Sequence, residues 1–460
     1  MRAVLISPYE LGRQPFALAH LAAVLEAAGV HTRCVDLAQQ RLVEAPLADA
    51  DLIVLSLGMH TATRIAVEAL PRIRERAPDA WLCAFGLYAP VNEGLLRSLG
   101  VGSVFGGESE PDLVAVAQAL GAGVRPAAGG VRRSGVRFMV PMRSGLPPLA
   151  RYAHLVLPDG TTRQAGFAEA SRGCKHLCRH CPVVPVYQGR FRAVPVDVVL
   201  ADVAQQVAAG AKHISFGDPD FLNGPTHALR VVRALHTRFP ALSYDATIKV
   251  EHLLAHRALL PELRATGCLF ITTAAESVED AVLERLAKGH TQADLETAVR
   301  LTRAAGIATA PTFVPFTPWS TLAGYRQLLH TLLALGLVHS VPPVQLSIRL
   351  LVPAGSYLLD LPGFAEMLQP FDPATLGYPW RHRDPRVDAL QAEVQRLAAA
   401  GEAEGRPRGE IFADIWRAAH AALGEPAPTL DPARFGPLIP RLSEPWYCCA
   451  EPTEQQLQSI

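Results

Sequence analysis

The chain has 460 residues, more than one hydrophobic core usually serves, so we expect two or three domains. Hydrophobic residues make up 49% and charged residues 19%, a globular balance that argues against a disordered chain. The 43 basic and 43 acidic residues cancel, which argues against a general electrostatic grip on nucleic acid or on an anionic membrane. No apolar run is long enough to span a bilayer, and the first residues lack the features of a signal peptide, so we expect a cytoplasmic protein.

The first 120 residues alternate predicted strands and helices. Strands are expected at 2–7, 31–36, 51–56, 80–85 and 101–105, with helices near 15–28, 64–76, 90–99 and 110–120. This alternation predicts a doubly wound, Rossmann-like α/β domain with a parallel sheet over residues 1–125. Ligands of such sheets lie beyond the carboxyl ends of the strands. Here those ends are Ser7–Tyr9, Ser56–His60, Gly86–Tyr88 and Gly106–Glu108.

Residues 121–151 hold six arginines and no acidic residue, and we interpret residues 126–160 as a linker over the surface. A second alternation then predicts a partial (β/α)6 barrel over 161–365. Its strands are expected at 167–170, 212–216, 241–249, 268–273, 306–314 and 344–350. Residues 366–460 are expected to form a helical extension, with helices at 384–403 and 408–422, followed by an irregular tail.

The cysteines indicate where function resides. Cys34, Cys83 and Cys268 stand alone in apolar runs and are expected to be small buried side chains. Three others, Cys174, Cys178 and Cys181, follow the first predicted barrel strand in a C-x3-C-x2-C spacing. Three thiolates on one loop can ligate three irons of a [4Fe–4S] cluster and leave the fourth iron open to an amine and a carboxylate. A zinc site with His176 or His180 as the fourth ligand is the alternative.

The loop AEASRGCKHLCRHC and the barrel around it resemble the radical S-adenosylmethionine (SAM) superfamily. The resemblance implies Cys174, Cys178 and Cys181 as cluster ligands, with SAM chelating the fourth iron. His180 stands where the family usually has an aromatic residue near the SAM adenine. For the rest of SAM, the resemblance implies an amine-binding turn at Gly217 and Asp218 (with Asp220 as an alternative), a ribose or methionine contact at Glu276 and a carboxylate contact at Arg349.

These last positions also have plainer explanations. Asp218 and Asp220 suit a turn capped by their own side chains, and Glu276 suits the start of a helix. A lone arginine such as Arg349 in an apolar strand commonly faces outward. The segment Lys288–His290 reads as the end of a helix, and no chemistry is assigned to it.

The front domain resembles the cobalamin-binding domain of cobalamin-dependent radical SAM proteins, in ISPYELGRQPF, SLGMHT and FGGESEPDL. It lacks the Asp-x-His-x-x-Gly element that supplies an axial histidine in other cobalamin proteins. The resemblance implies cobalamin held by backbone contacts at Ser56, Leu57, Gly106 and Gly107, with His60 as polar lining. The alternative is a domain that only packs against the barrel.

The tail WYCCAEP carries the adjacent pair Cys448–Cys449, which can form a vicinal disulfide or bind a thiophilic atom. It resembles a radical SAM subgroup ending in Cys-Cys-Ala-Glu-Pro, similar to the radical SAM enzymes of arsinothricin biosynthesis. The resemblance implies Cys449 as the reactive thiol, Cys448 as its partner and Glu451 as a nearby acid or base. Incidental thiols in an unordered tail are the alternative.

The sequence therefore predicts a radical SAM enzyme with a [4Fe–4S] cluster, SAM and cobalamin. It would cleave SAM reductively and act on a small molecule, such as an arsenic- or selenium-type acceptor held by the tail thiols. The alternatives are a cobalamin-dependent radical SAM methyltransferase and a non-catalytic iron–sulfur or metalloid sensor. Its expected partners are the small substrate and an electron donor such as a flavodoxin or ferredoxin, with no nucleic acid and no membrane.

Overall fold

A computed structural model describes residues 1–444 and 456, and its first domain is a six-stranded parallel sheet in the order β2-β1-β3-β4-β5-β6. The central strands β1, β3 and β4 read as near-continuous apolar runs because both faces of the sheet are covered there. Alternate residues along each strand belong to two separate cores, one packed against α1 and α4 and the other against α2 and α3. The elements are β1 (Arg2–Ser7), α1 (Phe16–Ala27), β2 (His31–Asp36), β3 (Leu52–Ser56), α2 (His60–Arg76), β4 (Trp81–Phe85), α3 (Glu93–Ser98), β5 (Ser103–Gly107), α4 (Glu110–Gly121) and β6 (Gly129–Arg132).

The stretch predicted to be a linker contributes to both domains. Gly129–Arg132 form β6, which pairs in parallel with β5 and extends the front sheet. Further on, Arg143 is buried, and its guanidinium donates to Asp202 Oδ1 at 2.6 Å and to the Phe167 carbonyl at 2.6 Å, both in the second domain. Arg143, one of the six arginines of residues 121–151, therefore anchors the connection between the domains to the barrel.

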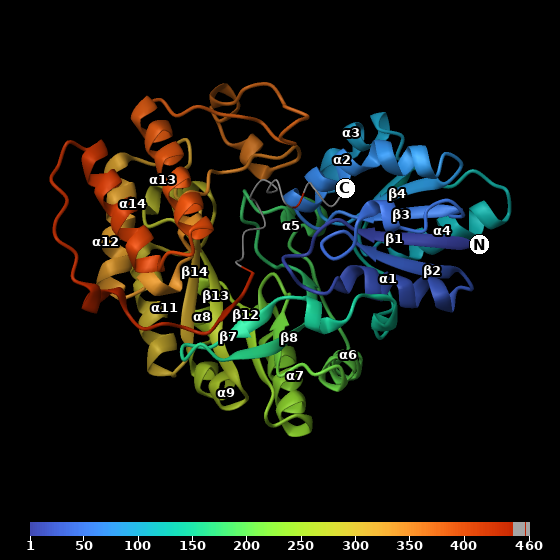
Figure 1. The fold of residues 1–460 in the computed structure, drawn as a ribbon, viewed down its shortest axis with the longest axis horizontal. Coiled ribbons are helices and arrows are strands. Elements are labelled where there is room, and N and C mark those ends of the chain that lie inside the picture. The colour runs from blue at the N-terminus through green and yellow to red at the C-terminus, as the bar shows by residue number, and fades with distance from the viewer. Residues whose placement is uncertain (445–455, 457–460) are drawn as a thin grey trace.

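The second domain is a curled sheet in the order β14-β13-β12-β11-β8-β7-β15 (Figure 1). Five parallel strands form the partial barrel, and helices lie along its outer face. The strands are β7 (His154–Val156), β8 (Thr162–Ala168), β11 (His213–Phe216), β12 (Ser243–Thr247), β13 (Cys268–Glu276), β14 (Ala308–Phe313) and β15 (Arg441–Leu442). The helices are α6 (Val196–Ala208), α7 (Pro225–Arg238), α8 (Val250–Ala255), α9 (Leu260–Ala265), α10 (Asp280–Arg285), α11 (Gln292–Ala304) and α12 (Leu322–Leu335).

The prediction of a sixth barrel strand at 344–350 is wrong in detail. Residues Pro343–Leu346 form a 3-10 helix, and only a single parallel bridge joins Phe316 to Arg349. Two prolines, Pro342 and Pro343, precede this segment, and proline offers no N–H to a sheet and fixes φ near −65°. The apolar residues 344–350 therefore form a turn instead of a strand that pairs along β14.

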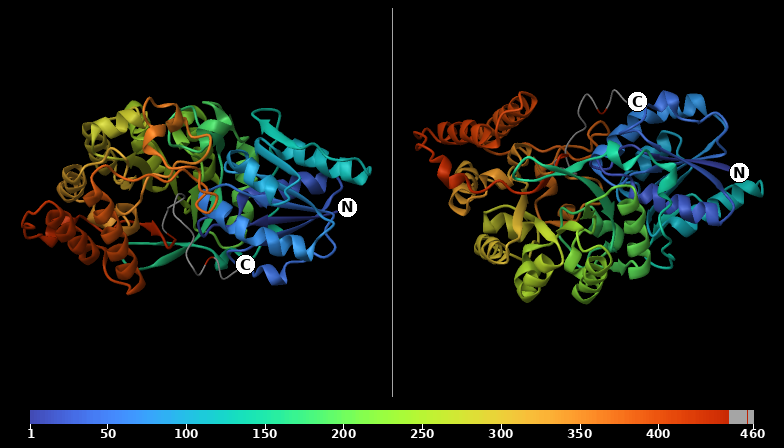
Figure 2. Two further views of the ribbon diagram at one scale, coloured as in Figure 1. Left: turned by 90° about the horizontal axis from the view of Figure 1, so that it is seen from above. Right: turned by 60° about the horizontal axis from the view of Figure 1, so that its bottom comes forward.

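The helical extension consists of α13 (Pro385–Ala403) and α14 (Arg408–Ala422), which share the barrel core with α12. In Figure 2 these two helices lie at the end of the molecule away from the front domain. After them the chain returns along the barrel, and Arg441–Leu442 pair antiparallel with β7. Glu444 then accepts a 2.5 Å hydrogen bond from the Tyr9 hydroxyl of the front domain. Among the described residues, no helix is both long and apolar enough to cross a membrane.

Candidate active site between the two domains

The three-cysteine loop is closed by a two-stranded ribbon. β9 (Ser171–Gly173) pairs antiparallel with β10 (Phe191–Ala193), and the cysteines and α5 (Val183–Tyr187) lie between them. Gly173, directly before Cys174, has φ +75°, and a Cβ there would lie 2.4 Å from the Arg190 carbonyl oxygen. Only glycine can make this turn without strain, so the sequence Gly-Cys sets the entry to the loop.

The loop is pinned to the barrel on both sides. The backbone N–H of Lys175 donates to Asn223 Oδ1 at 3.1 Å, and the N–H of Arg179 donates to the Leu286 carbonyl at 3.0 Å. The Arg179 side chain also donates to the Arg285 carbonyl at 2.8 Å. Sequence reasoning missed Asn223 and Arg179 because their partners are distant in the chain.

The chemistry of the three thiols fits an iron–sulfur cluster. Cys174 and Cys178 are buried, and burial raises the pKa of Cys174 and raises that of Cys181 to about 12. Such thiols need a bound cation to become thiolates. A single zinc ion would draw its sulfur ligands to about 3.8 Å of one another, but the three sulfurs are not among the described groups whose ligand atoms lie within 4.8 Å. The three sulfurs are therefore not gathered as closely as a single zinc ion would hold them.

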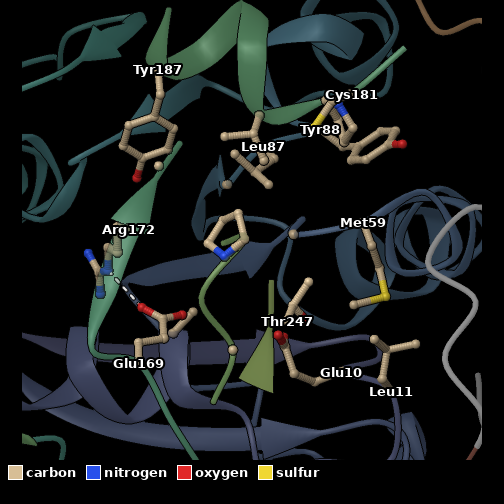
Figure 3. Close-up of a pocket in the computed structure, with 18 of the residues that line it drawn as sticks. Glu10, Leu11, Met59, Leu87, Tyr88, Glu169, Arg172, Cys181, Tyr187 and Thr247 are labelled. Atoms are coloured by element: carbon tan, nitrogen blue, oxygen red, sulfur yellow. Dashed lines mark hydrogen bonds and ion pairs between the residues drawn. The ribbon is translucent and has the colours of Figure 1, made fainter. Parts of the chain in front are cut away.

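A cavity of about 390 Å³ lies between the two domains, at the carboxyl edges of both sheets. The front domain supplies loops after β1, β3, β4 and β5, and the barrel supplies the cysteine loop and strand ends. In Figure 3, Met59 and Glu10 face the cavity from the front domain, while Arg172 and Cys181 lie at its edge on the barrel side. Its walls include Glu10, Leu11, Ser56, Gly58, Met59, Leu87, Tyr88, Gly107, Phe167, Glu169, Arg172, His180, Cys181, Gly217, Thr247 and Glu276.

Glu276 gives the barrel side of the cavity a negative charge. It ends β13 with φ +67°, lies 3.1 Å from His180 Nε2 and accepts from Lys288 Nζ at 3.3 Å. Burial opposes ionisation, but the charge of Lys288 and the hydrogen bond from His180 outweigh it and lower the Glu276 pKa to about 2. Lys288 is itself buried and stabilises the charge of Glu276. The sequence analysis assigned no chemistry to Lys288.

A buried polar network joins the domains beside the cavity, and sequence reasoning missed it. Arg172, two residues before Cys174, pairs with Glu110 of α4 at 2.5 Å and with Glu169 at 3.0 Å. His20 of α1 lies 2.9 Å from Glu110 through Nδ1, and its Nε2 accepts the Met139 N–H at 3.2 Å. Burial and the Arg172 charge lower the pKa of His20, so a neutral ring donates to Glu110.

Glu10 places a further carboxyl group in the cavity wall, in the loop after β1. Burial, reinforced by the charge of Glu169, raises the pKa of Glu10 to about 8. At neutral pH the cavity therefore holds an ionised carboxylate at Glu276 and a protonated carboxyl at Glu10. Groups whose environments separate their pKa values in this way can serve as acceptor and donor of protons.

Several residues predicted from the sequence meet at this cavity, and others do not. Those that line it are Ser56, Gly107, His180, Cys181, Gly217 and Glu276. Leu57 is fully buried behind the wall, and a Cβ on Gly106 would lie 2.4 Å from Pro90. His60 is also buried, with its ring 6.2 Å from that of Tyr88. Cys448, Cys449 and Glu451 lie outside the described residues.

Three charged residues predicted to contact SAM have other partners. Asp218 accepts the Ala170 N–H at 2.9 Å and the Ser171 hydroxyl at 2.5 Å, which supports the plainer turn interpretation. Asp220 is fully buried and faces histidines away from the cavity. Arg349 pairs with Asp388 at 2.7 Å and stacks on Trp380, with its guanidinium carbon 3.5 Å from the ring centroid.

Comparison with known proteins agrees with this geometry. Residues 169–322 match the Radical SAM superfamily, from the end of β8 to the start of α12. Ribosomal protein uS12 methylthiotransferase RimO of Geotalea uraniireducens is 25% identical over 174 residues, 36% of this chain and 38% of the relative. A tRNA-2-methylthio-N(6)-dimethylallyladenosine synthase of Haemophilus influenzae is 24% identical over 197 residues, 40% and 41% of the two chains. The chain thus spans about two fifths of the length of these relatives.

Two solved structures share most of the fold. The radical SAM methyltransferase TsrM of Kitasatospora setae, with cobalamin and a [4Fe–4S] cluster bound, has a TM-score of 0.59 and 18% identity over 73% of each chain. OxsB, a cobalamin-dependent SAM radical enzyme with aqua-cobalamin and SAM bound, has a TM-score of 0.67 and 14% identity, covering 87% of this chain and 67% of its own. Residues 169–322 therefore form a radical SAM domain, and the described chain shares the overall fold of these two structures.

Proposed function

We propose that this protein is an enzyme that holds a [4Fe–4S] cluster on Cys174, Cys178 and Cys181, binds SAM beside it and carries cobalamin on the front domain. The observation that carries the proposal is the cavity between the domains, which has Cys181 and Glu276 in one wall and the β3 and β5 loops in the other. Its volume of about 390 Å³ lies in the range of small-molecule sites. The substrate is proposed to be a small molecule, as expected from the sequence.

The front wall is suited to a large, flat cofactor held by shape. Gly58 lines the cavity, and a Cβ placed there would meet no atom within 4 Å, so the wall is open at this point. Met59, Leu87 and Tyr88 add apolar surface. Among the described lining residues the one histidine is His180, from the cysteine loop, and the front domain contributes none.

The chain's own groups would bind SAM and handle protons. The ionised Glu276 offers acceptors for the SAM ammonium group, and Lys288 and His180 hold it in place. The protonated Glu10 can donate a proton across the cavity. When bound, a reduced cluster supplies the electron that breaks a C–S bond of SAM, and cobalamin supplies a methyl carrier. A donor of the flavodoxin or ferredoxin class would reduce the cluster.

Methyl transfer is the reaction we propose first, because the front wall is built for a cofactor. Transfer of a 3-amino-3-carboxypropyl group to a thiophilic acceptor, held by Cys448 and Cys449, is the second candidate. The observation that favours it is that Glu444 bonds to Tyr9, next to the cavity residues Glu10 and Leu11. Glu444, four residues before the cysteine pair in the sequence, therefore lies beside the cavity.

The test is anaerobic reconstitution with iron and sulfide, followed by SAM and a strong reductant, with and without hydroxocobalamin. Mass spectrometry then identifies the product of SAM. S-adenosylhomocysteine that requires cobalamin supports methyl transfer, and methylthioadenosine supports the second candidate. Cys181→Ala should abolish all turnover, whereas Cys34→Ala, a cysteine on β2 remote from the cavity, should retain it. A protein that binds cluster and SAM but releases no SAM-derived product would contradict the enzyme proposal and favour a sensor.

A further inference from the structure

Two histidines and an aspartate converge on one point behind the cysteine loop, outside the cavity. His176 comes from the loop itself, Asp220 from the turn after β11, and His252 from α8. His252 Nδ1 lies 2.6 Å and His176 Nε2 3.3 Å from Asp220 Oδ2. Among the described residues this is the one group of three such side chains whose ligand atoms all lie within 4.8 Å of one another.

The converging atoms have no hydrogen-bond partners. Asp220 Oδ2, His176 Nε2 and His252 Nδ1 are each buried and lie at ion-pair distance, but none meets hydrogen-bond geometry with another. Asp220 is fully buried, and a buried carboxylate oxygen is best stabilised by a cation or a well-aligned donor. The three atoms point at a shared space rather than along hydrogen bonds to one another, which is the arrangement that a bound cation satisfies.

The opposite sides of the same groups are held by other residues. Asp220 Oδ1 accepts the Leu222 N–H at 3.2 Å, and His176 Nδ1 lies 3.4 Å from the Glu251 carboxylate. Histidines that ligate metals commonly present their second ring nitrogen to a carboxylate, which fixes the tautomer and the ring orientation. His176 therefore has both its inward and its outward nitrogen in the positions that a metal ligand requires.

We propose that His176, Asp220 and His252 bind a divalent first-row transition-metal ion such as Zn²⁺, separate from the iron–sulfur cluster. Two imidazole nitrogens and one carboxylate oxygen are a ligand set of Zn²⁺ and of Fe²⁺, with water completing the coordination. The ion would join three segments: the cysteine loop between Cys174 and Cys178, the turn after β11 and α8. Its effect is to fasten the cysteine loop to the barrel from the side opposite the cavity.

The test removes the cluster first, so that its iron cannot obscure the result. A variant with Cys174, Cys178 and Cys181 all replaced by alanine is stripped with a chelator and then titrated with Co²⁺, Zn²⁺ and Fe²⁺ under anaerobic conditions. Visible absorption of bound Co²⁺ and elemental analysis after gel filtration report the stoichiometry. We expect one ion per chain, with Zn²⁺ or Fe²⁺ displacing Co²⁺.

Asp220→Asn and His252→Ala, each added to this background, should weaken Co²⁺ binding at least about tenfold. His256→Ala is the matched control, because its ring lies 5.4 Å from that of His252 but is not a ligand. Less than a tenth of an equivalent of any of the three metals in the unaltered site, or equal binding in the ligand and control variants, would overturn the proposal. His252→Cys, which supplies a thiolate, should restore Zn²⁺ binding where His252→Ala loses it.

Discussion

Asp218 illustrates how burial changes a single carboxyl group. Burial raises its pKa to about 7, even though the Ser171 hydroxyl and the Ala170 N–H stabilise its charge. The folded state therefore favours the protonated form, whereas the unfolded chain has a pKa near 3.8. The raised pKa of Asp218 therefore contributes its full stabilisation of the folded state below pH 3.8. This contribution is lost as the pH rises through about 7.

We therefore predict that the free energy of unfolding of the unaltered protein falls, relative to that of Asp218→Asn, between pH 5 and pH 8. Urea unfolding at intervals across this range measures the difference. Asp197→Asn, an exposed change in the first turn of α6, should follow the unaltered protein. Parallel curves for Asp218→Asn and the unaltered protein would contradict the prediction.

Individual residues also mark the limit of sequence reasoning. The spacing of Cys174, Cys178 and Cys181 indicated the cysteine loop directly, because all three cysteines lie within eight residues. Arg349 and Lys288 could not be judged in this way. The first is paired with Asp388 and the second with Glu276, and neither partner can be found without the fold.

At the scale of elements, the alternation of apolar and helical segments predicted most strands and helices of both sheets. It failed at 344–350, where Pro342 and Pro343 prevent pairing, and at β6, whose four residues are all exposed and carry no apolar alternation. Short edge strands are held by pairing rather than by burial, so their own sequence gives little signal.

The loop after β3 offers a matched pair of glycine variants. Gly58→Leu should leave stability nearly unchanged, because its Cβ meets nothing within 4 Å, yet the side chain would occupy the cavity and should abolish the cobalamin binding that we propose. Gly86→Ala should instead destabilise the fold by about 2 kcal/mol or more, because φ is +115° and its Cβ would lie 2.6 Å from the Leu57 oxygen. Thermal unfolding and equilibrium dialysis with hydroxocobalamin separate the two effects. A strongly destabilised Gly58→Leu would contradict the open wall.

At the scale of the whole molecule, the Arg172–Glu110 pair couples the domains. Arg172→Met should lower the free energy of unfolding by about 3–5 kcal/mol, because it leaves Glu110 and Glu169 buried without their cation. Arg396→Met, which breaks the exposed pair with Glu393, should leave the free energy of unfolding nearly unchanged. Denaturant unfolding checks both.

A double-mutant cycle then separates the pair from its surroundings. The double variant Glu110→Gln/Arg172→Met should lower the free energy of unfolding by less than the sum of the two single changes, because neither charge of the pair is then left buried without its partner. Additive costs would mean that the two residues act independently and that the domains are joined by other contacts.

The pairing of β15 with β7 has a consequence for synthesis. β7 is made early, but its outer partner lies about 285 residues further along the chain. At ribosomal rates of about 5–20 residues per second, β7 waits on the order of 15–60 s with one edge open. An open edge is a template for pairing with another nascent chain. Slower translation or truncation before Arg441 should therefore increase aggregation of the newly made protein, even where the cavity itself is intact.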